Sequence, residues 1–267
     1  MGFNPGEFVT RKSYGSDIIF KIEKINDNQA ILRSYRLRLL ADAPLDDLIP
    51  YETAKNRIKK NIMLESYEYI ERQQRNLILN GKTMRNGNLE TYRERPGKIL
   101  HIDGDKDFLE MSLQNYQNLQ LDVKGIYISE RGQPEKIISY LKRYKPDILV
   151  ITGHDGVVNN KDYRTSEYFV STVQLARTYE SDLDNLVIFA GACQSDYQKL
   201  IDSGANFASS PQGVLIHFLD PILVAEKIAY TSVREVLSVK EVVKATVTGR
   251  EGIGGVETRG RLRLCFP

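Results

Sequence analysis

The sequence predicts an α/β protein with a doubly wound, mostly parallel sheet, preceded by a small β module and a helical linker. From residue 98 onward, short Ile, Leu and Val runs alternate with helical patterns, and the runs are continuous, which is typical of strands covered on both faces. Before residue 51, short β-type segments are separated by turn residues. We therefore expect three parts: a small β-barrel module over 1–50, a helical, basic linker over 51–97 and an α/β domain over 98–267.

The N-terminal part contains four segments with strand character, at 7–11, 18–22, 30–33 and 36–40. The run Asn26-Asp27-Asn28 between the second and third segments predicts a hairpin turn, because Asn and Asp tolerate turn conformations. Pro44 and Pro50 are expected to close the module. Short strands joined by turns at this spacing are typical of a small barrel.

The linker changes from a helical pattern to a loop. Residues 52–79 have partly periodic apolar positions among many charges, which predicts a helix. Residues 81–96 are rich in Arg, Asn and Gly and are expected to form a loop, where protease-sensitive sites concentrate. The basic side chains of this region include Arg72, Arg75, Lys82, Arg85, Arg93 and Arg95.

The α/β part alternates strands and helices in order. Strands are predicted at 98–103, 123–129, 147–152 and 186–190, and helices at 108–119, 134–144, 165–179 and 195–202. After residue 206 the pattern is weaker. It favours a helix over 221–236 and leaves the Gly-rich stretch 249–263 open.

Composition excludes several classes. With 41% hydrophobic and 27% charged residues the chain is typical of a globular protein, neither disordered nor fibrous. A net charge of +2 is too small to predict nucleic-acid binding, and no apolar stretch is long enough to cross a membrane. Residues 1–7 lack a secretory signal, so we expect folding in the cytosol and no disulfide between Cys193 and Cys265.

Reactive side chains follow three of the predicted strands, at 101–105, 152–156 and 190–195. Loops at the carboxyl ends of parallel strands meet in one crevice, so we expect these residues to lie together. Cys193 precedes a helix, where backbone N–H groups and the helix dipole favour a thiolate, and His154 would supply the activating base. The N–H groups of Gly156 and Cys193 are candidate donors to an oxyanion.

The two segments that carry His154 and Cys193 are DILVITGHDG at 147–156 and NLVIFAGACQ at 185–194. They resemble the His-Gly and Ala-Cys signatures of the clan of caspases, gingipains, clostripains and legumains. With KSYG at 12–15 and RLLAD at 38–42, the whole chain resembles the YabG family, the sporulation-specific proteases of endospore-forming bacteria.

The resemblance implies a caspase-like peptidase domain over 98–267, and we expect the module before it to be an SH3-like barrel. It also implies Cys193 as nucleophile, His154 as base and cleavage after Arg, with no cofactor and no metal. The expected substrates are spore-coat and germination-related precursor proteins, with no nucleic-acid or membrane partner. The expected place is the cytoplasm of the sporulating cell, at the forming spore coat. An enzyme that cuts after Arg could also process itself in the basic linker.

Two details of the predicted site stay open. The clan has Gly directly after the histidine, whereas Asp155 stands there in this chain, so either Asp155 or Gly156 could supply the second oxyanion donor. A pocket for Arg needs a carboxylate, because a guanidinium is best held by two parallel hydrogen bonds. Asp103, Asp105 and Asp196 are the candidates, and each could equally be a solvated loop acid or a helix cap.

Other functions compete with the peptidase hypothesis. The run KPDILV at 145–150 resembles a strand of receiver domains, which would make this a binding domain without catalysis, although Thr152 stands where the acceptor Asp is expected. The N-terminal barrel could instead dock proteins or nucleic acid. Cys193 would then be a small buried hydrophobe. His101 and His217 are interpreted as structural residues in either case.

Overall fold

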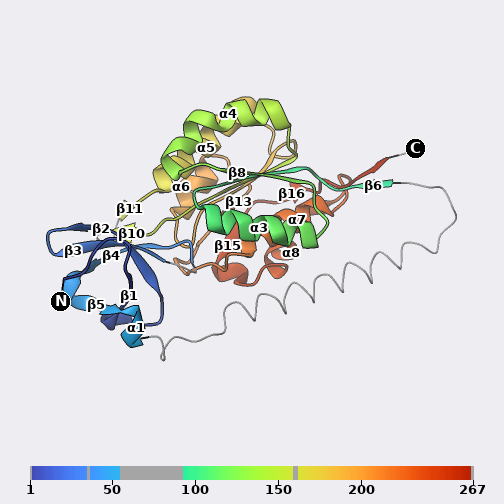
Figure 1. Cartoon of the computed structure of the whole chain (residues 1–267). Helices are drawn as coiled ribbons and strands as arrows, with labels where there is room; N and C mark the ends of the chain where they lie inside the picture. Colours follow the sequence, from blue (N-terminus) through green and yellow to red (C-terminus); the bar gives the residue numbers. More distant parts are fainter. Residues whose placement is uncertain (1, 35–36, 55–92, 159–161, 266–267) are drawn as a thin grey trace.

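A computed structural model describes residues 2–34, 37–54, 93–158 and 162–265. Two sheets dominate the structure: a five-stranded antiparallel sheet near the N-terminus and a six-stranded, mostly parallel sheet that follows it (Figure 1). The mixed α/β class predicted from the apolar runs is confirmed. The helix predicted over 52–79 and most of the loop predicted over 81–96 lie outside the described residues, apart from α1 (Tyr51–Ala54) and β6 (Arg93–Arg95).

The antiparallel sheet, here called the N-terminal sheet, has the order β4-β3-β2-β1-β5. Its strands are β1 (Phe8–Arg11), β2 (Phe20–Asn26), β3 (Gln29–Ser34), β4 (Leu40–Pro44) and β5 (Leu48–Pro50). The predicted hairpin turn is confirmed, because Asn26 pairs with Gln29 and Asp27 has a φ of 51°. The strand predicted over 36–40 was wrong in position. Pairing with β3 begins at Leu40, since the carbonyl of Arg38 is bonded to the other part of the protein.

The six-stranded sheet has the order β15-β13-β12-β9-β7-β8. Its strands are β7 (Ile99–Asp103), β8 (Val123–Tyr127), β9 (Ile148–Thr152), β12 (Val187–Ala190), β13 (Phe207–Ser209) and β15 (Ile253–Gly255). All neighbours are parallel except β15, which runs antiparallel to β13 at the edge. The prediction of a mostly parallel sheet is therefore confirmed.

Helices cover both faces of this sheet, with α4, α5 and α6 on one side and α3, α7 and α8 on the other (Figure 1). Their bounds are α3 (Lys106–Asn118), α4 (Gln133–Tyr144), α5 (Ser166–Tyr179), α6 (Tyr197–Asp202), α7 (Asp220–Ala229) and α8 (Val239–Lys244). Each layer packs on a separate apolar core. The continuous apolar strands thus fill both cores, as the sequence pattern requires.

Two corrections concern the ends of segments. The helix predicted over 221–236 ends at Ala229, because the following residues pair with the C-terminal segment: Val233 N–H donates to the Leu262 carbonyl. The end of the loop predicted over 81–96 is the strand β6, which pairs antiparallel with β17 (Arg263–Cys265). Both pairings join segments far apart in sequence, which local patterns do not predict.

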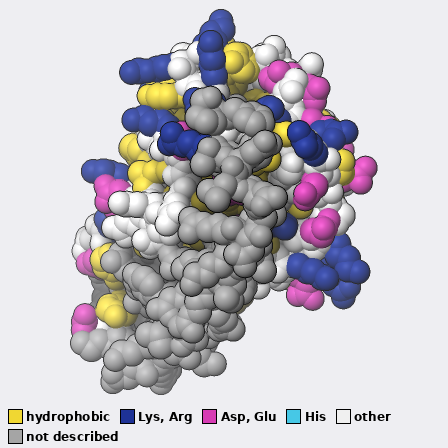
Figure 2. Space-filling view, turned by 90° about the vertical axis from the view of Figure 1, so that its right-hand side faces the viewer, with side chains coloured by type: hydrophobic (Ala, Val, Ile, Leu, Met, Phe, Trp, Pro, Cys, Tyr) yellow, Lys and Arg dark blue, Asp and Glu magenta, His cyan; other side chains and the backbone are white. Residues whose placement is uncertain are grey.

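Short two-residue strands complete the structure: β10 (Val157–Val158) with β11 (Asp162–Tyr163), and β14 (Val236–Leu237) with β16 (Thr258–Arg259). Within the described ranges no helix has the length and apolar character needed to span a bilayer. On the face shown in Figure 2, the visible basic and acidic side chains are interspersed, consistent with the small net charge.

Candidate active site

The loops that carry His154 and Cys193 follow neighbouring strands. β9 and β12 are parallel partners, with Ile151 opposite Ala190, so both loops leave the sheet at the same carboxyl edge. The N-terminal sheet lies at this edge (Figure 1), and Leu39 forms a bridge with Asp155. The two loops therefore lie at the same edge of the sheet, as predicted. The N-terminal sheet covers them.

Cys193 is buried beneath the N-terminal sheet. It packs in the apolar core of that sheet with Val9, Phe20 and Leu39. Its backbone N–H donates to the carbonyl of Arg38 at 3.2 Å, and its Sγ lies 3.5 Å from the carbonyl oxygen of Ile216. Burial raises the pKa of the thiol to about 12, although the Arg38 charge opposes this shift. In this state the thiol is protonated.

His154 is also buried, and two charged groups flank its ring. Its Nδ1 lies 3.7 Å from Oδ2 of Asp105 and 3.5 Å from Nη1 of Arg33. Its backbone N–H donates to Oε1 of Glu130 at 2.7 Å, and Phe108 packs against the ring with centroids 5.6 Å apart. Burial lowers the pKa of His154 to about 4, helped by Arg33 and opposed by Asp105. Its Nε2 has no hydrogen-bond partner within the described part of the chain.

The residue after the histidine is held by its own side chain. The Asp155 carboxylate accepts hydrogen bonds from the N–H groups of Gly156 at 2.8 Å and Thr165 at 2.9 Å, and from the Ser166 hydroxyl. The Gly156 N–H is thereby occupied. The Asp155 N–H donates to the Arg38 carbonyl at 3.3 Å, beside the Cys193 N–H. Of the two candidate second donors, the geometry favours Asp155.

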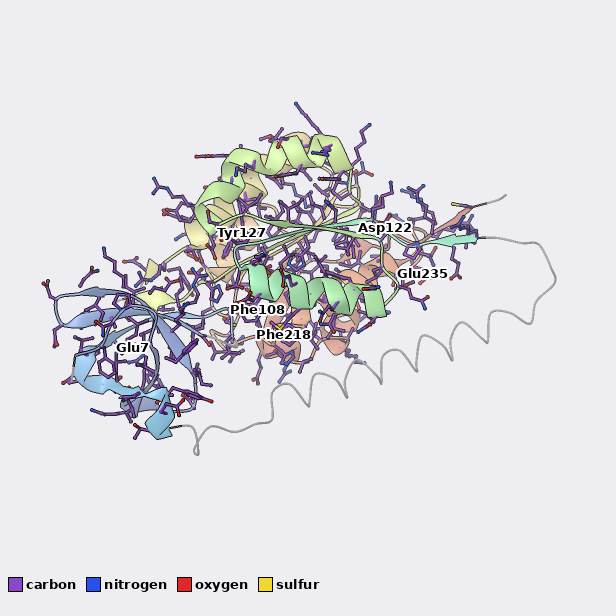
Figure 3. All side chains as sticks on the ribbon, in the orientation of Figure 1. Glu7, Phe108, Asp122, Tyr127, Phe218 and Glu235 are labelled. Carbon is purple, nitrogen blue, oxygen red and sulfur yellow. The ribbon has the colours of Figure 1, made fainter. Side chains whose placement is uncertain are left out.

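Arg38 itself fills the space next to this pair of donors. Its Nη2 lies 2.7 Å from Oδ2 of Asp103, and its Nη1 donates to the Phe218 carbonyl at 3.2 Å. The guanidinium carbon lies 4.8 Å above the Phe108 ring. Phe108 and Phe218 lie close together on the side facing the N-terminal sheet (Figure 3), with ring centroids 6.3 Å apart. Arg38 is 1% exposed, so this is an enclosed guanidinium pocket.

The three candidate acids differ in what they contact. Asp103 is buried, bonds Arg38 and accepts from the Thr152 hydroxyl at 2.8 Å. Burial alone would raise its pKa, but the Arg38 charge and the contact with His101 hold it below its ordinary range. Asp105 caps α3 and lies beside His154. Asp196 caps α6 and pairs with Lys199 at 2.8 Å. The described contacts therefore join Asp103, and neither of the others, to Arg38.

The other histidines have structural contacts. His101 is buried, with Nε2 2.7 Å from the Thr152 hydroxyl, and Nδ1 of His217 accepts from the Leu219 N–H at 3.2 Å. Among the residues that the structure describes, no group of three or more His, Cys, Asp or Glu side chains is arranged to hold a metal ion.

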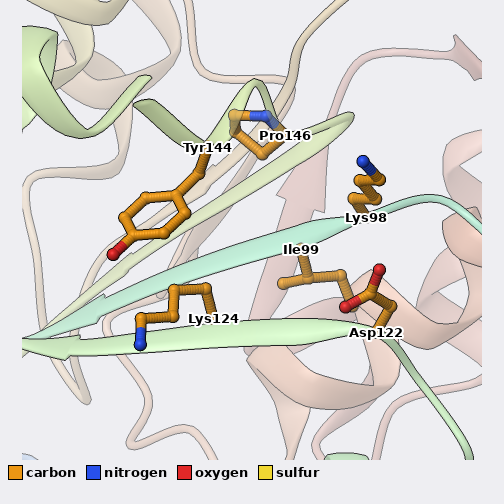
Figure 4. Close-up of a pocket in the computed structure, with 6 residues that line it drawn as sticks. All are labelled: Lys98, Ile99, Asp122, Lys124, Tyr144 and Pro146. Atoms are coloured by element: carbon orange, nitrogen blue, oxygen red, sulfur yellow. The ribbon is translucent and has the colours of Figure 1, made fainter. Parts of the chain in front are cut away.

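Sequence reasoning missed Glu130, Arg33 and Phe108. Glu130 could have been found, because it follows β8 at the same carboxyl edge of the sheet as the His154 loop. A separate pocket opens at the opposite, amino end of β7 and β8 (Figure 4). Its lining residues are Lys98, Ile99, Asp122, Lys124, Tyr144 and Pro146.

Comparison with known proteins identifies the family of the chain. The model of the family described as "YabG peptidase U57" matches residues 4–267. The chain belongs to this peptidase family. It is 41% identical over 290 residues to the sporulation-specific protease YabG of Bacillus subtilis strain 168, a match that covers 100% of this chain and 99% of the relative. The resemblance to the YabG family stated from the sequence is confirmed, and the chain is accordingly a peptide-bond hydrolase.

Proposed function

We propose that this chain is a cysteine endopeptidase that cuts after Arg, with Cys193 as nucleophile and His154 as general base and acid. The observation that carries the proposal is the placement of Arg38. Its carbonyl oxygen accepts hydrogen bonds from the Cys193 and Asp155 N–H groups, while its guanidinium bonds Asp103. An arginine thus lies where the acyl-side residue of a substrate would have to lie.

In the proposed reaction His154 takes the proton of the Cys193 thiol, and the thiolate attacks the carbonyl carbon after the substrate Arg. The N–H groups of Cys193 and Asp155 stabilise the resulting oxyanion. The C–N bond breaks, a thioester forms, and the imidazolium gives its proton to the leaving amine. Water then attacks the thioester, which releases a carboxylate and restores the thiol. The step needs no cofactor.

The proposed Arg preference rests on the acid in the pocket. Asp103 is fully buried and its pKa is held low, so it stays ionised at neutral pH. A buried carboxylate without a cationic partner is costly, which favours Arg over an uncharged side chain at this position. The neighbouring ring of Phe108 adds a cation–π contact.

The proposed biological setting comes from the relatives. The matched protein of B. subtilis is described as sporulation-specific. We therefore propose that this chain acts during sporulation on proteins, with spore-coat and germination precursors as candidate substrates, in the cytoplasm beside the forming coat. The alternative of a receiver-like binding domain without catalysis is disfavoured by membership in a peptidase family.

The test is incubation with an arginyl peptide that carries a thiol-reactive warhead, followed by peptide mapping. We expect the label on Cys193 and none on Cys265, which lies in β17 beside β6. The matched control is the same probe with norleucine in place of arginine, which should label Cys193 far more slowly. Labelling of Cys265 instead of Cys193 would contradict the assignment.

A further inference from the structure

Residues 37–39, directly before β4, lie against the loop that carries His154. Leu39 pairs in parallel with Asp155, and the Leu40 N–H donates to the Asp155 carbonyl at 2.9 Å. The approach is so close that a Cβ on Gly156 would lie 1.9 Å from the Leu40 carbonyl oxygen. This part of the chain therefore binds along the His154 loop in the way that a peptide adds to a sheet edge.

Arg38 uses every recognition element of the site at once. Its carbonyl oxygen occupies the pair of N–H donors from Cys193 and Asp155, at 3.2 and 3.3 Å. Its guanidinium occupies Asp103 and the Phe218 carbonyl, at 2.7 and 3.2 Å. A second arginine cannot enter the same pocket while Arg38 is there.

The rest of the N-terminal sheet seals the reacting groups. Cys193 is 1% exposed and lies in the apolar core of that sheet, and Arg33 of β3 lies beside the His154 ring. Burial leaves both the thiol and the imidazole uncharged, as their pKa values of about 12 and about 4 indicate. A reactive thiolate must be accessible to the substrate, and its charge must be solvated or paired. The buried Cys193 meets neither condition.

We propose that Arg38 is a built-in substrate mimic and that the N-terminal sheet is a tethered inhibitor of the peptidase. The inference rests on the proposed function, since it needs the Cys193 site to be the active site. A tethered segment competes at an effective concentration in the millimolar range or above, so a free substrate at micromolar concentration loses the competition. Displacement of residues 37–40 opens the donors, the guanidinium pocket and the thiol together.

The first test compares full-length wild type with Arg38→Ala. The measured quantity is the second-order rate constant for labelling of Cys193 by the arginyl probe, on chains whose intact mass has been checked at time zero. We expect Arg38→Ala to be labelled at least about tenfold faster, because the pocket is vacated. Arg11→Ala is the matched control: Arg11 lies in the same sheet and pairs with Asp47, and its removal should leave the rate unchanged.

A second variant protects the test against misfolding of Arg38→Ala. Gly156→Ala keeps Arg38 but places a methyl group against the Leu40 carbonyl, which must push the segment away. We expect faster labelling of Cys193 here as well. A wild-type chain that cuts itself after Arg38 before labelling also supports the proposal, because that bond must then have reached the nucleophile.

The inference is overturned if Cys193 is labelled at the same rate in wild type, Arg38→Ala and Gly156→Ala, with every chain intact. The proposed function would survive that result, since Cys193 still reacts. Failure to label Cys193 in any folded chain overturns the function itself, and the inference with it.

Discussion

The two sheets of this protein contribute different parts of the candidate active site. The parallel sheet supplies the proposed reacting groups, His154 and Cys193, from loops after adjacent strands. The N-terminal sheet supplies what covers them, through Arg38 and the apolar core around Cys193. The proposed catalytic residues lie at the edge that the parallel topology creates, whereas the antiparallel sheet presents one loop and one apolar face to it. The difference suggests separate tests for chemistry and for access.

The largest expected effect belongs to the parallel sheet. Cys193→Ala should lower kcat by a factor on the order of 10⁴ or more, because the attacking sulfur is lost while Ala nearly conserves the buried volume. The measurement is hydrolysis of an arginyl peptide with the chain's melting temperature recorded in parallel. Cys265→Ser is the control and should change kcat by less than about twofold, since residue 265 lies in β17. Equal losses in both variants would break the assignment of chemistry to the sheet edge.

The next effect separates recognition from chemistry. Asp103→Asn should reduce kcat/KM for arginyl substrates by about 100-fold relative to norleucyl ones, because the cationic side chain loses its buried partner. Asp196→Asn is the matched control, as this acid caps α6 and pairs with Lys199. A larger loss with Asp196→Asn would move the specificity pocket to the other loop.

A smaller effect concerns pH at the boundary between the sheets. The folded pKa of His154 is about 4, below its ordinary value of 6.5, so the unfolded chain binds the proton first as pH falls. The contribution of His154 to the free energy of unfolding is therefore full above pH 6.5 and decreases toward pH 4, by at most about 3 kcal/mol. Burial of His101 acts in the same direction.

Urea unfolding of wild type and of His154→Gln between pH 7 and pH 5 measures this contribution, and the variant should lose less stability than wild type as pH falls. Buried carboxyls act in the opposite direction as pH falls: burial raises the pKa values of Glu130, Asp155 and Asp220, and that of Glu226 to about 7. The same pH dependence in wild type and His154→Gln would contradict the buried, neutral imidazole.

The smallest expected effect is on the free energy of unfolding, and it tests whether the two sheets unfold together. Lys145 ends α4 in the left-handed region with a φ of 45°, and Asp27 does so in the β2–β3 turn with a φ of 51°. Replacing Lys145 by Gly should raise the free energy of unfolding by about 0.5–1 kcal/mol. Asp27→Gly should change it less, because Asp tolerates this conformation. If calorimetry shows two transitions, each variant should move a different one.

Local sequence patterns predicted the parallel sheet and its loops well, because continuous apolar runs report burial on both faces. β7, β9 and β12 agree with the predicted strands to within a residue or two. The contact between Arg38 and Asp103 was not predictable in this way, since it joins two sheets across 65 residues. The same holds for β6 and β17, whose pairing depends on the tertiary fold. The sequence thus indicates Asp103 as one of three candidate acids, and its contact with Arg38 distinguishes it from Asp105 and Asp196.

The pairing of β3 with β4 has a practical consequence for the detection of chain cleavage after Arg38. β3 and β4 are joined by five paired positions, from Gln29 with Pro44 to Arg33 with Leu40. A break between residues 38 and 39 would leave both new ends fastened in one folded sheet. Native chromatography would report a single unbroken particle, and two pieces would separate only after denaturation.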